Sequence, residues 1–307
     1  MKRIKKAGSV LRNTIQGFID DNALKLSASL SYYTTFAIGP LLILIMSLAG
    51  AFFGRDAVEG RIYHQIRGLV GSEAALQVQQ IIINIQQSEA TTVGTIIGGV
   101  VLFIGATGVF TEMQDSINYI WSVKAKPRKG WLKFLINRLI SFSLIVGISF
   151  ILLVSLVVNA LLNLMSDKLG RILPHYSVQF IYVINSVIIV IVISLLFAVI
   201  FKVLPDAIIA WKDAFVGALF TALLFLVGKF IIGYYLGNSK LGFTYGTAAS
   251  IIIILSWVYY SAIILYFGAE FTKMFALSHG AGIKPKDTAV FIIKKEAKEI
   301  PPSYLET

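Results

Sequence analysis

Cysteine is absent from this 307-residue sequence, and histidine occurs only three times. Without thiols the chain has no disulfide, thiolate-bound metal or cysteine nucleophile. His64, His175 and His279 fall in three separate segments, so they do not form the ligand cluster that a metal-dependent hydrolase needs. The sequence also lacks a phosphate-binding loop, a dinucleotide glycine pattern and a nucleophile elbow. These absences argue against an enzyme, and we expect neither a metal nor a cofactor.

Charged residues are scarce at 14%, whereas 57% of residues are hydrophobic and the mean hydropathy is +0.79. The apolar residues gather in long runs, each near or above the roughly 18 to 20 residues that cross a ~30 Å hydrocarbon layer. Five runs are uncharged and a sixth holds three charges; they are Leu26–Gly54, Val93–Phe110, Leu139–Leu162, Tyr176–Phe201, Leu241–Ala269 and, with the charges, Ala210–Leu236. The sequence therefore predicts an all-α, polytopic membrane protein with six transmembrane helices.

Basic residues are distributed unequally between the loops. The segment before the first run, the loop after the second, the loop after the fourth and the tail hold six, six, two and six of the 27 Lys and Arg residues. Basic loops are retained in the cytoplasm. We therefore expect a multi-pass protein of the bacterial inner (plasma) membrane with both termini cytoplasmic. The net charge of +11 then reflects orientation and affinity for anionic headgroups, so membrane lipids rather than nucleic acid are the expected partners.

The chain is interpreted as a transmembrane domain at 1–277 and a cytoplasmic tail at 278–307. The prolines of the tail, among interspersed lysines and glutamates, predict partial disorder there. Within residues 1–25, apolar residues recur every three or four positions, which favours a basic amphipathic helix on the inner leaflet over a solvated leader. Within the predicted external insertion 55–92, apolar residues lie opposite glutamines, which predicts a short amphipathic helix capping the bundle.

The end of the second run carries the densest polar pattern. Helical spacing places Glu112, Asp115 and Tyr119 on one face, with Asn118 beside them. Counted from Val93, Glu112 lies about 28 Å along the helix, near the inner edge of the hydrocarbon. One interpretation is a solvated helix end. The other is the polar lining of a cavity that opens to the cytoplasm.

Lys229 and Glu270 are charges within apolar runs. Lys229 lies about 22 Å into the fifth run, where it either snorkels to the outer surface or faces the bundle. Because helical side chains lean toward the helix N-terminus, here cytoplasmic, the bundle-facing interpretation is favoured. Glu270 lies near the inner edge, and we expect an ion pair with Arg138 or Lys212 rather than catalysis.

Two further patterns concern the first and fifth runs. The inner half of the first run is crowded with hydroxyl groups, including Tyr32 and Tyr33, at a density greater than packing requires. Small residues recur in the fifth run at Gly217, Gly228 and Gly233, which favours close helix packing.

Several of these segments together resemble one known family. They are Leu30–Phe36 with Pro40, Thr111–Trp121, Leu204–Asp206 followed by Trp211–Asp213, and Tyr245–Ser250 leading to Phe267–Glu270. The sequence is similar over about residues 18–275 to the YihY/BrkB family of bacterial inner-membrane proteins, formerly mislabelled as ribonuclease BN. The resemblance implies a six-span fold and a role in the cell envelope, without an established substrate. The sequence offers no nuclease site, so the ribonuclease label is not adopted.

We hypothesise a transporter or flippase-like protein for a small solute or an envelope lipid precursor. An anionic small molecule or lipid is the expected substrate, attracted by Lys229. The substrate-cavity candidates are Tyr32, Tyr33, Glu112, Asp115, Asn118, Asp206, Asp213, Lys229 and Glu270. The alternative is a non-transporting membrane scaffold or envelope assembly factor in which these charges form buried pairs. A membrane-bound hydrolase is the third hypothesis, but Glu112 and Asp115 alone are too few to hold a metal. The sequence specifies neither the oligomeric state nor the coupling ion.

Overall fold

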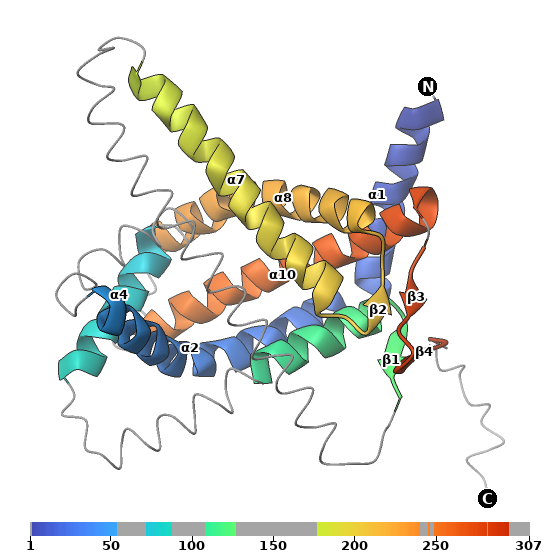
Figure 1. The fold of residues 1–307 in the computed structure, drawn as a ribbon. Coiled ribbons are helices and arrows are strands. Elements are labelled where there is room, and N and C mark those ends of the chain that lie inside the picture. The colour runs from blue at the N-terminus through green and yellow to red at the C-terminus, as the bar shows by residue number, and fades with distance from the viewer. Residues whose placement is uncertain are drawn as a thin grey trace, which may run out of the picture.

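The computed structural model describes residues 2–53, 72–87, 108–126, 177–239, 245, 249–280 and 282–294. These residues are mostly helical (Figure 1). The helices are α1 (Lys2–Asp20), α2 (Ala23–Phe53), α4 (Ser72–Gln87), an unlabelled helix at 108–120, α7 (Ser177–Val203), α8 (Trp211–Gly237) and α10 (Ala249–His279). α2, α8 and α10 run side by side, and α7 crosses them obliquely (Figure 1).

The predicted apolar runs correspond closely to helices where the structure describes them. The first, fourth and fifth runs become α2, α7 and α8. α8 and residues 251–279 of α10 are each long and apolar enough to cross a membrane. The third run and nearly all of the second lie outside the described residues. The described residues thus confirm a mostly helical fold with two helices that could cross a membrane, and the six-span arrangement stays a prediction.

The sixth helix differs from its predicted run. α10 begins at Ala249 and continues beyond Ala269 to His279, so it carries Glu270 and Lys273 within regular helix. Nothing in residues 270–279 breaks a helix, and α10 stops where Gly280 and Gly282 follow. The amides of both glycines donate to the Ala276 carbonyl, at 3.0 and 3.2 Å. Gly282 has a φ of +76°, the left-handed conformation typical of a helix C-terminus.

Small residues bring α8 and α10 into close antiparallel contact. A Cβ atom added at Gly217 of α8 would lie 1.9 Å from the Thr272 hydroxyl of α10, and one at Gly268 of α10 would lie 2.0 Å from the Thr221 hydroxyl of α8. Each threonine thus fills the space that the opposite glycine leaves. Gly228 contacts α10 similarly, whereas a Cβ atom at Gly233 would meet no atom of the described residues within 4 Å. The packing prediction is confirmed for Gly217 and Gly228 and stays a prediction for Gly233.

Short strands join chain segments at one end of the bundle. β1 (Val123–Ala125) pairs with β4 (Ala289–Phe291), and β2 (Ala207–Ile208) pairs with β3 (Lys284–Pro285), both antiparallel. Residues 282–294, here named the C-terminal strap, contribute one strand to each pair. The partial disorder expected for the tail therefore does not extend to the strap, because the backbone of two connections between helices offers it hydrogen-bond partners. Residues 295–307 lie outside the described part of the chain.

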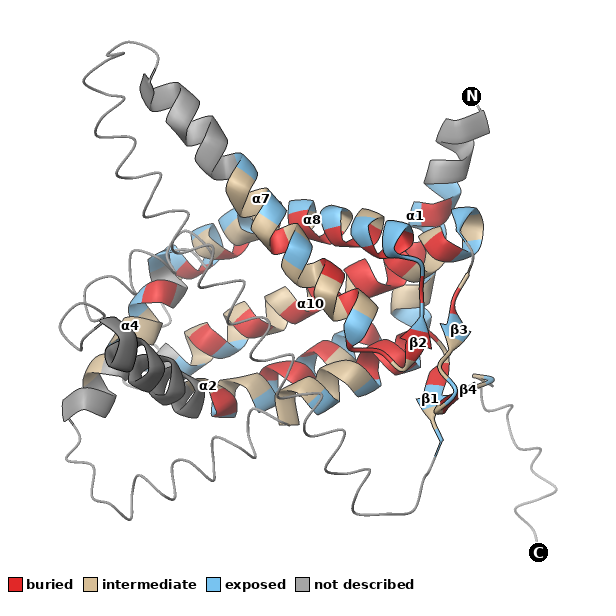
Figure 2. Ribbon diagram, viewed as in Figure 1, coloured by how far each residue is buried: buried red, intermediate tan, exposed pale blue. Residues whose placement is uncertain are grey.

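The described core concentrates near the strands. Ile117, Ile120, Phe201 and Tyr266 are among its fully buried side chains, and buried residues cluster where α10 approaches the β2 connection (Figure 2). α4 lies at the opposite end, against α2, α8 and α10. The prediction of a short helix within the insertion is thereby confirmed.

Candidate functional site

Four charged residues, of which the two acids are buried and the two lysines half-buried, form a cluster at the end of the bundle that holds the strands. It consists of Asp21, Glu270, Lys273 and Lys294, here named the charged cluster. The Lys273 ammonium lies 3.4 Å from Asp21 Oδ2 and 3.3 Å from Glu270 Oε2, and the Lys294 ammonium lies 2.6 Å from Asp21 Oδ1. Two acids thus balance two bases. The cluster joins the connection between α1 and α2, the helix α10 and the C-terminal strap.

The chain reverses at Asp21 because two residues there do not continue the helix. Asn22 adopts a φ of 51°, in the left-handed region that asparagine tolerates better than most residues. α1 therefore ends at Asp20 and α2 begins at Ala23, with Asp21 held in the corner between them. The corner is tight enough to leave Asp21 only 5% exposed.

The helix at 108–120 also ends at the charged cluster. Lys273 donates to the Ile120 carbonyl at 2.6 Å, and Lys294 approaches the same oxygen at 3.4 Å. The last carbonyls of a helix lack partners within the helix and attract cations. Lys294 also lies over the Tyr119 ring, 4.3 Å from its centre. The ammonium groups of Lys273 and Lys294 therefore bring four segments together: the connection between α1 and α2, the helix at 108–120, α10 and the C-terminal strap.

Glu270 is the most deeply buried member of the cluster, with no exposed surface. A Cβ atom added at Gly17 of α1 would lie 2.8 Å from Glu270 Oε2, so a larger residue there would require the Glu270 carboxylate to move. Oε2 accepts no hydrogen bond of ordinary geometry from the described residues, and the charge of Lys273 lies 3.3 Å away. The expected pairing with Lys212 is wrong, because Lys212 is exposed at the start of α8; Arg138 lies outside the described residues.

The environment shifts the pKa of the cluster members that lie outside the membrane-spanning helices. Burial acts to raise the pKa of Asp21. Hydrogen bonds with Glu270 and Lys294, together with the charges of Lys273 and Lys294, outweigh burial and hold that pKa below its ordinary value of 3.8. Burial lowers the pKa of Lys294 below 10.5, although Asp21 and Glu270 partly oppose it. Asp21 is therefore held as a carboxylate.

A second polar group links the helix at 108–120 to the connection between α7 and α8. Asn118 donates to Asp206 Oδ2 at 3.0 Å and accepts from the Asp206 amide at 2.8 Å, while Gln114 donates to the same Oδ2 at 3.2 Å. The Lys286 amide of the strap donates to the Asp206 carbonyl at 2.9 Å. The structure thus brings two of the predicted cavity residues, Asn118 and Asp206, into direct contact.

Glu112 and Asp115 lie beside this group. Asp115 is exposed and Glu112 half-buried, and the charges of Glu112 and Asp206 both act on Asp115. Tyr266 of α10 is buried next to Ser116. Of the predicted shared face, Asp115 and Tyr119 are exposed and Glu112 is half-buried, whereas Asn118, beside that face, is buried and points to Asp206. Among the described residues, no group of three or more His, Cys, Asp or Glu side chains is placed to hold a metal ion.

The hydroxyl groups in the polar half of α2 are hydrogen-bonded to the backbone of the same helix. The hydroxyls of Ser27, Ser31, Thr34 and Thr35 each donate to a carbonyl three or four residues earlier, at 2.8 Å. Such bonds satisfy a hydroxyl inside a helix without a ligand. Tyr32 and Tyr33 lie on an exposed face, and the Tyr33 ring approaches Gly108. The inference that these hydroxyls exceed structural need was therefore wrong for the four Ser and Thr residues.

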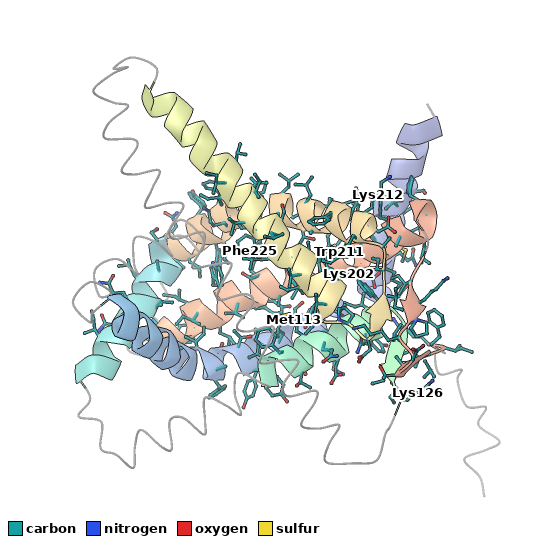
Figure 3. All side chains as sticks on the ribbon, viewed as in Figure 1. Met113, Lys126, Lys202, Trp211, Lys212 and Phe225 are labelled. Atoms are coloured by element: carbon teal, nitrogen blue, oxygen red, sulfur yellow. The ribbon has the colours of Figure 1, made fainter. Side chains whose placement is uncertain are left out.

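The remaining candidates lie on α8, apart from the charged cluster. Asp213, in the first turn of α8, is buried against Gly280, and its Oδ2 has no hydrogen-bond partner among the described residues. Lys229 is half-buried, 5.3 Å from the centre of the Phe230 ring. Near the start of α8, Lys202 donates to the Ile209 carbonyl and lies 5.4 Å from the Trp211 ring (Figure 3). Asp213 and Lys202 make no hydrogen bond or ion pair with Glu270 among the described residues.

Sequence reasoning missed three members of the charged cluster: Asp21, Lys273 and Lys294. One signal was available, because Lys273 follows Glu270 by three residues and such pairs are neighbours on a helix. Nothing in the sequence indicates that Asp21 and Lys294 meet, since they come from opposite ends of the chain.

Comparisons with known proteins agree with this architecture. UPF0761 membrane proteins of Saccharophagus degradans and of a Psychrobacter species are each 25% identical to the chain, over 88% and 90% of its length; the chain covers 60% and 50% of theirs. A UPF0761 membrane protein of Tolumonas auensis is 26% identical over 80% of the chain and 78% of its own length. The chain thus spans little more than half the length of the first two relatives. No solved structure matches it.

The family comparison covers nearly all of the described fold. Residues 14–291 match the family described as virulence factor BrkB. The match runs from Thr14 on α1 to Phe291 on β4, so it includes Asp21, Glu270 and Lys273 and ends just before Lys294. The relatives are named membrane proteins, and two helices of this chain are long and apolar enough to cross a bilayer. The chain is therefore an integral membrane protein that belongs to the BrkB family.

Proposed function

We propose that this protein moves a small solute or an envelope lipid precursor across the bacterial inner membrane. The observation that supports this proposal is the charged cluster. Buried charges are costly unless each is paired, and they stabilise a bundle less than apolar residues of similar size. A cluster of this kind is suited to a junction that closes and opens, because water or a charged ligand replaces the pairs when the segments part. We therefore interpret the charged cluster as a gate at one end of the bundle.

The closed gate holds four segments together. Lys273 bridges Asp21, Glu270 and the end of the helix at 108–120, and Lys294 ties the strap to the same corner. Opening requires α1 or the strap to move away from α10. Lys229, further along α8, supplies a positive charge to attract the anionic group of a substrate.

The proposed orientation places both termini in the cytoplasm. The Asp21–Lys294 ion pair supports this, because it holds the end of α1 and the strap at the same end of the bundle. Labelling tests it directly, since the chain has no cysteine of its own. A single cysteine at Lys126 should react with an impermeant reagent only after the membrane is opened. A cysteine at Lys240 should react in intact cells, and the reverse pattern would invert the topology.

A non-transporting scaffold is the second candidate function, and one observation favours it. Asn118 and Asp206 satisfy each other's polar groups, which is what a static joint requires. In this alternative the charged cluster is a permanent joint between segments.

The two candidates differ in what a deletion strain accumulates. We propose to complement the deletion strain with the wild type, Lys229→Met or Lys212→Met. Lipids and metabolites of each strain are then measured separately for each leaflet or compartment. Transport predicts that one anionic compound builds up on one side, and that Lys212→Met corrects this while Lys229→Met does not. Lys212 is the matched control because it lies exposed on the same helix. Complementation without any change in distribution between compartments would instead favour the scaffold.

A further inference from the structure

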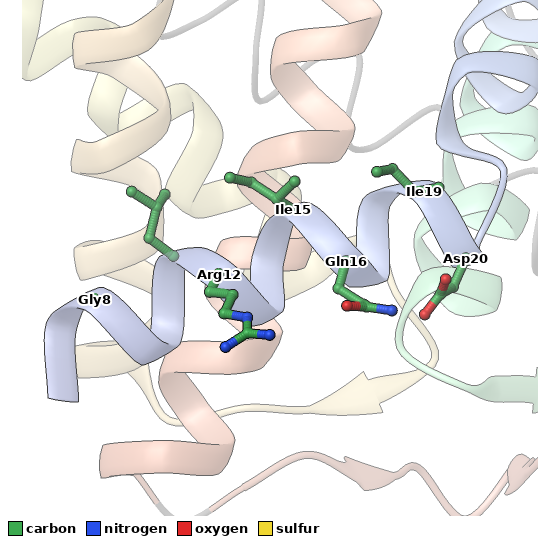
Figure 4. Close-up of a pocket in the computed structure, with 7 residues that line it drawn as sticks. Gly8, Arg12, Ile15, Gln16, Ile19 and Asp20 are labelled. Carbon is green, nitrogen blue, oxygen red and sulfur yellow. The ribbon is translucent and has the colours of Figure 1, made fainter. Parts of the chain in front are cut away.

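We propose that the outer face of α1 is a docking surface for anionic phospholipid headgroups of the bilayer that the protein spans. A shallow groove of about 430 Å³ follows this face. It has an apolar edge formed by Leu11, Ile15 and Ile19 and a polar edge formed by Arg12, Gln16 and Asp20 (Figure 4). This inference is independent of the transport proposal.

α1 has three distinct faces. Val10 and Thr14 are buried on the face toward α10, where Phe18 also packs edge-on against Phe267 with the ring centres 5.6 Å apart. Leu11, Ile15 and Ile19, four residues apart, form an exposed stripe; they are 43%, 48% and 67% exposed. The third face carries Asn13 and Gln16, which are exposed and polar. A helix with one face on protein, one apolar and one polar fits the boundary between hydrocarbon and water.

The direction of α1 agrees with such a position. α8 and α10 are the helices that are long and apolar enough to cross the bilayer. α1 runs across their ends instead of alongside them (Figure 1). A helix transverse to the spanning helices lies along the membrane surface.

Charge complementarity identifies the lipid as anionic. The first twelve residues contain Lys2, Arg3, Lys5, Lys6 and Arg12 and no acidic residue. Asp20 closes the far end of the groove, so a headgroup phosphate is favoured at the Arg12 end, where arginine offers paired donors to phosphate oxygens. The stripe of Leu11, Ile15 and Ile19 then contacts the acyl chains. A basic protein partner is disfavoured by the same charges.

Two single cysteines test the docking surface in the full-length protein. A fluorophore is attached to Ile15→Cys on the apolar stripe or to Asn13→Cys on the polar face, in vesicles of phosphatidylcholine or of an equal mixture with phosphatidylglycerol. We expect spin-labelled lipid to quench the label at position 15 and aqueous iodide to quench the label at position 13. Phosphatidylglycerol should strengthen the lipid contact. Adding Arg12→Gln should reduce the gain in lipid contact that phosphatidylglycerol causes about fivefold, because one basic residue contributes about 1 kcal/mol at an anionic surface.

Three results would overturn the proposal. Iodide reaching both labels equally would place the face in water. A position-15 label shielded from both quenchers would mean that protein, such as a second copy of the chain, covers the stripe. Equal lipid contact in both vesicle types, or no effect of Arg12→Gln, would reject the headgroup assignment. Arg12 and Asn13 are exposed, so these variants leave the fold intact; thermal unfolding of each variant verifies this.

Discussion

Gly17 of α1 lies directly against the carboxylate of Glu270 on α10. A Cβ atom at Gly17 would lie 2.8 Å from Glu270 Oε2 and 3.1 Å from the Met274 terminal carbon. The missing side chain therefore lets α1 approach α10 closely enough for Asp21 to reach Lys273.

Gly17→Ala should displace Glu270 from Lys273. Because Glu270 is fully buried, we expect a loss of about 1–3 kcal/mol, the usual cost of overpacking. Thermal unfolding of the purified protein measures it. The matched control is Gly8→Ala on the same helix, where a Cβ atom would meet nothing within 4 Å. Gly8→Ala should be neutral or slightly stabilising, since alanine favours helix over glycine by about 1 kcal/mol. Equal stability of the two variants would refute the contact.

Gly217→Ala should separate α8 from α10, because the added carbon would lie 1.9 Å from the Thr272 hydroxyl. We expect about 1–3 kcal/mol of destabilisation, with partial recovery in the Gly217→Ala/Thr272→Ala double variant, which removes the clashing atoms. Gly233→Ala, on the same helix, serves as the control, because no atom of the described residues lies within 4 Å of a Cβ atom there. If the double variant is no more stable than Gly217→Ala, the clash is not the cause.

Asn118→Ala should destabilise the connection between α7 and α8. It removes the donor to Asp206 Oδ2 and leaves the Asp206 amide without its acceptor, so we expect about 1–3 kcal/mol of lost stability. Hydrogen exchange at the Asp206 amide should accelerate in this variant. Gln114→Ala removes a single donor at 3.2 Å and should leave that exchange slow. Unchanged exchange in Asn118→Ala would contradict the assigned hydrogen bond.

Asp21 should make the protein acid-sensitive. Its folded-state pKa lies below the ordinary 3.8, so its contribution to stability is fully present above that pH. The contribution is lost as the pH falls through the lower, folded-state pKa. Unfolding followed between neutral pH and pH values below 3.8 should show a drop that Asp21→Asn reduces. Asp20→Asn changes the exposed neighbour and should retain the wild-type drop. Identical acid profiles for wild type and Asp21→Asn would reject the role of Asp21.

The sequence predicted those elements whose signal is local. The apolar run of α7 is uncharged, that of α8 holds only three charges, and the alternation of apolar residues and glutamines in α4 has helical spacing. Gly217 and Gly228 were recognised as packing residues because small residues recur along one helix. Gly233 belongs to the same series, but the described residues place no atom within 4 Å of a Cβ atom there, and the pattern alone does not distinguish it from Gly217 and Gly228.

The candidate sites depend on contacts between distant residues. Asn118 and Asp206 are 88 positions apart, and each was identified as polar without its partner. The β3 and β4 pairings of the strap were missed, because two or three residues form each strand and prolines around them indicate a flexible tail. Because the strap was not predicted from the sequence, neither was the position of Lys294. The sequence therefore did not show that two lysines face Asp21 and Glu270.

The gate is tested most directly by linking its two sides. Asp21→Cys and Lys294→Cys together replace a 2.6 Å ion pair in a chain without other cysteines, so a short reducible cross-linker joins only these two positions. The same cells are compared before and after reduction of the link, with complementation of the deletion strain as the measurement. A gate predicts that function is lost in the linked form and returns on reduction. Full function of the linked protein would show that the charged cluster is a static joint and would contradict the transport proposal.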